Sequence, residues 1–207
     1  MKKTSKNSVL ARIYGNGRGW AFSAKDFTAQ IPRIDIDVAL SSLVKENKIR
    51  RVMRGIYDYP IYSEILKKNV APDLKQIANA LARKFSWRII PTGDTALNYL
   101  GISTQLQSKY VYLSDGPSKS YKIDSQTLEF RHSALKDLSF KHDNSVIVVQ
   151  ALKAIGEDNI ADEILNKISS RFSSDELEKI KIDTKNTTGW IYKNICKTIS
   201  NFAKKNG

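Results

Sequence analysis

The densest group of chemically capable side chains is a run of cations around one glycine. Four of them fall within seven residues: Lys48, Arg50, Arg51 and Arg54. Val52, Ile56 and Tyr57 are typical of strands, and Gly55 allows the chain to reverse, so the run predicts a two-stranded ribbon. Cations on such a ribbon can neutralise the phosphates of a nucleic acid. The alternative is a basic edge that only faces water.

A second group lies just upstream, where it could read bases. It consists of Arg33, Ser41, Ser42 and Lys45. The periodicity predicts a helix over residues 35–47 with one apolar face, formed by Ile36, Ala39, Leu40, Leu43 and Val44. The other face carries small or hydrogen-bonding groups, as a helix needs in a major groove about 12 Å wide. Asp35 and Asp37 would repel phosphates unless they cap the helix or accept from cytosine N4; the alternative is an ordinary solvated face.

These residues require elements that hold the helix and the ribbon together. Ser23 and Asp26 have the spacing of a capping box, which predicts a short helix over residues 23–28. Pro32 follows as a turn. Helix, turn, helix and basic wing in this order predict a winged helix-turn-helix domain over residues 1–60, closed by Pro60. We therefore expect this domain to bind double-stranded DNA.

The composition favours a polyanionic partner. The chain has 207 residues and a formal charge of +13, and residues 1–60 hold 12 Lys/Arg against 5 Asp/Glu. The single cysteine, Cys196, excludes an intramolecular disulfide and a cysteine-rich zinc site and fits the reducing cytoplasm. No apolar run approaches the roughly 18 residues of a membrane span. No apolar stretch of a signal peptide follows the basic start.

Residues 61–207 predict a mixed domain. Residues 61–71 are expected to form a partly helical connection, and apolar spacing predicts a helix over residues 73–85. Strand-like alternation covers residues 110–114, 120–123 and 127–131, with a hairpin turn at 115–118 between the first two. Helices are expected from about residue 145. The fold class is therefore α+β: a winged helix-turn-helix, then a mixed helix and antiparallel-sheet domain that ends in a helical region.

Carboxylates that could hold a metal are sparse. Asp115, with Glu129 and Arg131 on later strands, is weakly similar to the two acids and cation of restriction-type nucleases, in which the acids bind a divalent metal. However, Arg131 stands where such sites have lysine, and Asp115 suits a turn. His132 and His142 lack the spacing of metal ligands. We therefore expect no catalysis, no metal and no cofactor, and keep a metal-dependent nuclease as an alternative.

Several short motifs are shared with a known family. They are the wing over 48–60 with Arg54-Gly55-Ile56-Tyr57, then Pro72-Asp73, Ala80-Leu81-Ala82, Pro91-Thr92-Gly93, Ala96-Leu97-Asn98, 100–105 and 111–118. On these motifs, residues 10–138 resemble the AbiEi-like antitoxins of bacterial type IV toxin–antitoxin (abortive infection) systems, in a DUF6088-like branch.

The resemblance implies a winged-helix domain that represses its own operon and a C-terminal domain that counters a nucleotidyltransferase toxin without needing a stable complex. We place the antitoxin function at Ser114, Asp115 and Lys119. The expected partners are operator DNA and such a toxin, with no membrane, for a cytoplasmic monomer or weak dimer. A winged-helix regulator without a toxin, whose C-terminal helices dimerise or sense a ligand, remains an alternative.

Overall fold

The computed structural model describes residues 5–105, 107–134 and 140–206. The chain forms two compact units, Met1–Arg88 and Ile89–Gly207. The sequence placed the division at Pro60, before the helix α3 (Leu74–Phe85). The structure assigns α3 to the first unit because Arg83 ties it there: its Nε lies 2.6 Å from Asp26 Oδ1 and its Nη2 donates to the carbonyl of Ala21 at 2.8 Å.

The first unit begins with a helix, a short strand, a 3-10 helix and a second helix. These are α1 (Ser5–Asn16), β1 (Ala21–Phe22), η1 (Ala24–Phe27) and α2 (Arg33–Lys45). The predicted cap of η1 is confirmed, because the backbone NH of Ser23 donates to Asp26 Oδ2 at 2.8 Å. The predicted apolar face of α2 is buried in a core with α1 and the rings of Phe22 and Phe27, which meet edge to face at 5.6 Å.

The ribbon predicted after α2 is present. Strands β2 (Arg50–Met53) and β3 (Ile56–Asp58) pair antiparallel around a turn at Arg54 and Gly55, and β1 pairs with the other edge of β3. Gly55 has φ +74°, a left-handed conformation that costs other residues free energy. The register shifts between Arg51 and Met53, which makes Val52 the extra residue of a β-bulge. We refer to β2, β3 and their turn as the wing.

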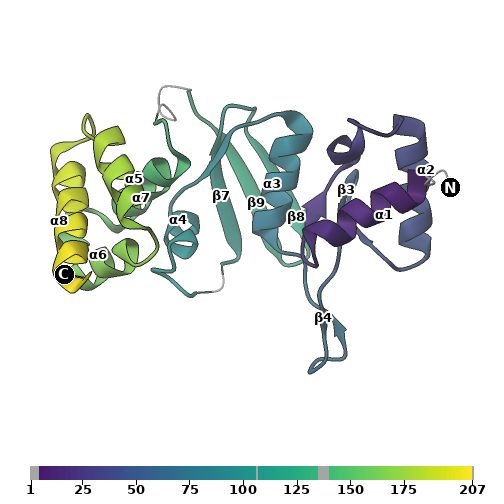
Figure 1. Ribbon diagram of the computed structural model, residues 1–207, viewed down its shortest axis with the longest axis horizontal. Coiled ribbons are helices and arrows are strands. Elements are labelled where there is room, and N and C mark those ends of the chain that lie inside the picture. Colours follow the sequence, from purple (N-terminus) through teal and green to yellow (C-terminus); the bar gives the residue numbers. More distant parts are fainter. Residues whose placement is uncertain (1–4, 106, 135–139, 207) are drawn as a thin grey trace. The chain divides into compact units, whose positions relative to one another are not determined.

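Residues 61–70 form a hairpin, so the prediction of a partly helical connection is wrong. Its strands are β4 (Tyr62–Ser63) and β5 (Lys68–Asn69), and Figure 1 shows it extending away from the rest of the unit. The backbone NH of Val70 donates to the carbonyl of Ile61 at 2.8 Å, and Lys67 takes a left-handed conformation at φ +50° in the turn. Its tip is exposed, with Ile65 at 94%.

The second unit is built on a four-stranded sheet of order β6-β7-β9-β8. The strands are β6 (Ile89–Pro91), β7 (Lys109–Ser114), β8 (Lys119–Ile123) and β9 (Gln126–His132). The predicted hairpin of β7 with β8 is wrong: β9 lies between them, parallel to β7 and antiparallel to β8. Leu128 and Phe130 of β9 are fully buried, whereas most residues of β8 are exposed. The strand β9, with two fully buried side chains, therefore takes a central position, and the more polar β8 forms an edge.

Helices complete this unit. Besides α4 (Asp94–Tyr99), they are α5 (Asp143–Ile155), η3 (Glu157–Asn159), α6 (Asp162–Ser169), α7 (Ser174–Asp183) and α8 (Gly189–Asn206). Their stripes share one core that includes Leu152, Leu165, Ile180 and Ile191. The α+β class and the helical C-terminal region are confirmed. Within the described residues, no helix combines the length and the apolar character that crossing a membrane requires.

Candidate nucleic-acid interface

The outer face of α2 carries both apolar and polar groups. Ile34 and Val38 are 78% and 66% exposed, although both are aliphatic. They belong to the lining of an open hollow of about 550 Å³, formed by Ile34, Asp37, Val38, Ser41, Ser42 and Lys45. Three predicted site residues, Ser41, Ser42 and Lys45, therefore lie together. Ile34 was not among the predicted residues, although it lies four residues before Val38 on the same face.

The two acids of α2 are engaged by neighbouring groups. Ser5 Oγ donates to Asp35 Oδ2 at 3.1 Å, which links α2 to the start of α1. Arg33 Nε donates to Asp37 Oδ2 at 2.9 Å, one helical turn along. The predicted conflict between these carboxylates and phosphates is thereby reduced, since an adjacent cation offsets the negative charge of Asp37. Arg33 stays largely exposed at the N-terminal end of the helix.

Three side chains contact the carboxylate of Glu46 at the end of α2. Ser42 Oγ donates to it at 2.7 Å, Lys48 Nζ lies 3.1 Å from its Oε2, and Lys6 of α1 contacts its other oxygen. The hydrogen bonds from Lys6, Ser42 and Lys48 lower the pKa of Glu46 from 4.5 to about 2. Lys6 and Glu46 thus link α1 to the end of α2, and Ser42 and Lys48 bond to the same carboxylate.

Arg50 has a different position from the other wing arginines. Its Nε and Nη2 donate to the two oxygens of Asp58 at 3.0 and 2.5 Å, across the ribbon. Its Nη1 donates to the carbonyl of Val70 at 3.0 Å, after β5. The Asp58 side chain is 3% exposed, so the forked pair is a buried contact within the wing, and the bond to Val70 ties the wing to the end of the hairpin. Arg50 has little donor capacity left for a phosphate.

Arg51 and Arg54 remain available. Both are exposed, and within the described residues neither guanidinium has an ion-pair or hydrogen-bond partner. Lys84 of α3 lies beneath the same turn, where its Nζ donates to the carbonyl of Arg54 at 3.3 Å. The sequence could not associate Lys84 with the wing, because α3 lies far along the chain and was assigned to the other domain. Lys84 therefore lies at the turn with Arg54, and Arg51 lies on the adjoining strand β2.

The charge excess of the chain is concentrated in the first unit. Residues 1–88 hold 18 Lys/Arg against 7 Asp/Glu, whereas residues 89–207 hold 16 against 14. The net charges are therefore +11 and +2. A positive field of this strength around the outer face of α2 and the wing attracts polyanions.

The three residues proposed for antitoxin function lie near the loop between β7 and β8. The hydroxyl of Ser114 is buried and accepts from the backbone NH of Gly116 at 3.0 Å. His132 Nδ1 lies 3.0 Å from the carbonyl of Gly116 and further fixes the loop. Lys119 is exposed, with its ammonium 5.3 Å from the ring centre of Tyr121. Ser114 therefore shapes the loop, and Lys119 presents a charge beside it.

The acids of the nuclease alternative are not brought together. Glu129 of β9 pairs with Val111 of β7, and Asp115 follows the end of that strand, four residues after Val111. That spacing is about 13 Å along the sheet, too far for one metal ion to bridge. Glu129 is held by Lys109 and by Arg131, whose Nε lies 2.6 Å from it, and these bonds lower its pKa. Among the described residues, no group of three or more potential metal-ligating side chains occurs.

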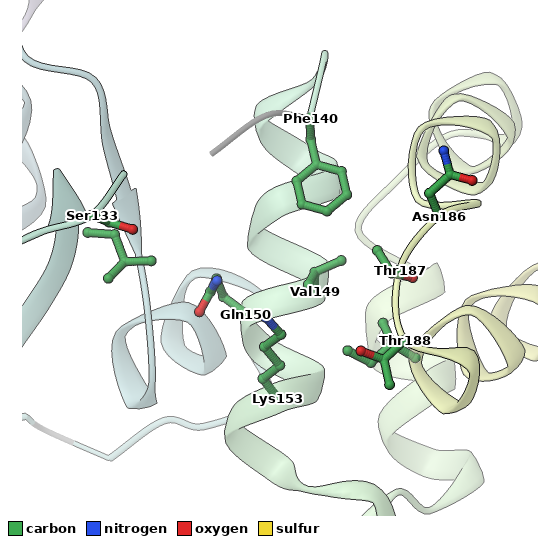
Figure 2. A pocket seen from close by; sticks show the side chains of 10 residues that line it. Ser133, Phe140, Val149, Gln150, Lys153, Asn186, Thr187 and Thr188 are labelled. Atoms are coloured by element: carbon green, nitrogen blue, oxygen red, sulfur yellow. The ribbon is translucent and has the colours of Figure 1, made fainter. Parts of the chain in front are cut away.

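A second hollow of about 550 Å³ lies within the C-terminal unit. Figure 2 shows Val149, Gln150 and Lys153 along α5, opposite Thr187 and Thr188 of the segment before α8. The full lining consists of Leu113, Ser133, Phe140, Val149, Gln150, Lys153, Asn186, Thr187, Thr188 and Ile191. It contains amide, hydroxyl and ammonium groups, and none of these residues was predicted as functional. The residues assigned to antitoxin function lie outside this lining.

Comparison with known proteins places the chain in a family. The model of DUF6088, described as a family of unknown function, matches residues 8–180. The chain belongs to this family. The curated proteins gave no match for this DUF6088 member. Among solved structures, it is similar to the RV2827C protein from Mycobacterium tuberculosis, with 11% sequence identity and a TM-score of 0.43, over 96% of this chain and 77% of that chain. A similarity at this level supports no statement about function.

Proposed function

We propose that this DUF6088 protein is a winged helix-turn-helix repressor of its own operon and the antitoxin of a type IV toxin–antitoxin system. In this reading α2 enters the major groove of operator DNA, the wing contacts the phosphate backbone, and the second unit counters a nucleotidyltransferase toxin. The DNA-binding part follows from the geometry of the first unit. The antitoxin part follows from the resemblance of the sequence motifs to AbiEi-like antitoxins.

The observation that supports DNA binding most strongly is the state of the wing cations. Arg51 and Arg54 have exposed guanidinium groups that no residue in the described part of the chain pairs with, and they belong to a unit of net charge +11. Exposed guanidinium groups in a strongly positive unit attract phosphates, which offset the excess positive charge. We assign these two arginines to phosphate contacts and Arg50 to holding the wing in place.

Groups that could read bases lie on α2. Ser41 and Lys45 are exposed and line the hollow on its outer face. Arg33 can leave its ion pair with Asp37 and hydrogen-bond to a base edge instead. Both side chains of the pair are more than half exposed, and exposed ion pairs contribute little to stability. Ser42 and Lys48 can contribute to phosphate contacts only in competition with Glu46.

The test of DNA binding is a salt titration of the full chain on a duplex from upstream of its own gene. The logarithm of affinity should fall linearly with the logarithm of salt concentration, and each lost phosphate contact should reduce that slope by about one. We expect Arg51→Ala with Arg54→Ala to reduce it by about two. Lys122→Ala, which removes an exposed cation of β8 in the other unit, is the matched control and should leave it unchanged. A wild-type slope retained in the double variant would refute the wing assignment.

The antitoxin part needs a separate test. Co-expression with a nucleotidyltransferase encoded beside the gene should restore growth that the enzyme alone arrests. Lys119→Ala and Asp115→Ala should weaken the rescue without changing DNA affinity, because both lie in the second unit. Operator binding without any rescue would instead favour the regulator without a toxin.

A further inference from the structure

Two aliphatic side chains on α2 have no role in the core of the first unit. Ile34 and Val38 are 78% and 66% exposed, whereas Ile36 and Leu40 on the opposite face are fully buried. At 3.6 residues per turn, Ile34, Val38, Ser41 and Lys45 fall within an arc of about 60°. Isolated apolar residues at a surface are common, but here two line one hollow together with hydroxyl and ammonium groups. The stripe is therefore apolar toward the N-terminal end of α2 and polar toward its C-terminal end.

The charge of the unit indicates what this stripe contacts. If a second copy of the chain bound here, two units of net charge +11 would face each other, and they would repel one another. Duplex DNA brings phosphates on both sides of a groove that admits a helix. The floor of that groove also has an apolar group, the C5-methyl of thymine, which apolar side chains contact directly.

We propose that Ile34 and Val38 read the C5-methyl groups of thymine in the major groove. The inference rests on the proposed DNA binding and adds a base preference to it. Ser41, on the same stripe, can hydrogen-bond to a neighbouring base edge of either kind. The same methyl group occurs on 5-methylcytosine, and the experiment has to distinguish the two sources.

The test compares two duplexes of the same upstream sequence, one with thymine and one with deoxyuridine throughout. Deoxyuridine keeps every hydrogen-bonding group of thymine and lacks only the methyl. Burying one methyl is worth about 0.8 kcal/mol, so each lost contact should weaken wild-type binding about fourfold, and two contacts about fifteenfold. The measurement is the dissociation constant from fluorescence anisotropy at fixed salt.

The matched variant is Ile34→Ala with Val38→Ala. Both positions are exposed and alanine is the better helix former, so the fold should persist, as circular dichroism can verify. This variant should bind the thymine duplex more weakly and bind both duplexes equally. Arg51→Ala should lose affinity for both duplexes while keeping the wild-type ratio, because it contacts phosphate.

Four results would overturn the inference, and they differ in what else fails. If the wild type binds no DNA at all, both the proposed DNA binding and the contact with thymine methyl groups are refuted. If the wild type binds the two duplexes with equal affinity, the contact with thymine methyl groups is refuted but the proposed DNA binding is not. If deoxyuridine has no effect but 5-methylcytosine strengthens wild-type binding, the methyl belongs to modified cytosine instead of thymine. If the wild type self-associates in sedimentation and the double alanine variant does not, with no thymine dependence, the stripe is a protein interface.

Discussion

The two units, residues 1–88 and 89–207, differ for their lengths in both their bases and their acids. They hold 18 and 16 Lys/Arg, but 7 and 14 Asp/Glu. In the first unit, two paired carboxylates are buried, Asp58 at 3% exposure and Asp26 at 7%, and both hold elements together. In the second unit, acids such as Glu163 and Asp162 are mostly exposed and pair with lysines at the surface. The positive charge of the first unit thus comes both from more bases for its length and from fewer acids, two of which are buried in ion pairs.

The largest expected effect tests the structural use of charge in the first unit. Arg50→Ala leaves the Asp58 carboxylate buried without its forked partner, and we expect a loss of about 3 kcal/mol in the free energy of unfolding. Arg51→Ala, next to it on the same strand, should change this quantity by less than about 0.5 kcal/mol. Urea denaturation measures both. Equal losses in the two variants would remove the distinction between a structural and an available arginine.

The turn of the wing should respond to a loss of backbone freedom. Gly55→Ala puts a side chain at φ +74°, where its Cβ would lie 2.8 Å from Lys84 Nζ. The lysine can move, so the backbone conformation dominates and we expect a loss of about 1 to 2 kcal/mol. Gly55→Asn is the matched control, because asparagine tolerates the left-handed region better and should lose less. Thermal unfolding of the two variants gives the comparison.

Helix caps should behave alike in the two units, because they depend on local bonds and not on net charge. Asp73 accepts from the backbone NH of Lys75 at 2.8 Å at the start of α3, and Ser173 forms a reciprocal capping box with Glu176 at the start of α7. Replacing either cap by alanine should cost about 1 kcal/mol in chemical denaturation. A much larger loss at Asp73 alone would indicate that this acid also offsets the cations around it.

The smallest expected effect is a pH dependence of the first unit. The pKa of Glu46 is lowered from 4.5 to about 2 in the folded chain, so its stabilising contribution is present above pH 4.5 and is lost as the pH falls toward 2. Glu46→Gln lacks this contribution at every pH. The midpoints of thermal unfolding of wild type and variant should therefore differ at pH 6 and converge near pH 2. A constant difference across this range would contradict the lowered pKa.

Patterns with a short repeat were predicted well from the sequence. The buried face of α2 and the capping of η1 depend on spacings of three to four residues, which the sequence displays directly. The pairing of β9 with β7 depends instead on which strand buries more apolar surface, and a turn-like segment at 115–118 suggested the wrong neighbour. The outer face of α2 was located, but Ile34 was missed because an apolar residue is expected to point inward. The engagement of Asp35 by Ser5 needed the packing of α1 on α2, which no local pattern reveals.

The bulge at Val52 has a consequence for which arginine could contact DNA. In a regular hairpin closed by Arg54 and Gly55, the residue opposite Asp58 would be Arg51; the extra residue moves Arg50 there instead. One inserted residue thereby decides which of two chemically identical neighbours completes the fold and which one faces outward. If Val52 instead took a regular place in the ladder, Arg51 would lie opposite Asp58 with the composition of the cations unchanged, so the wing is specified by its register as much as by its charge.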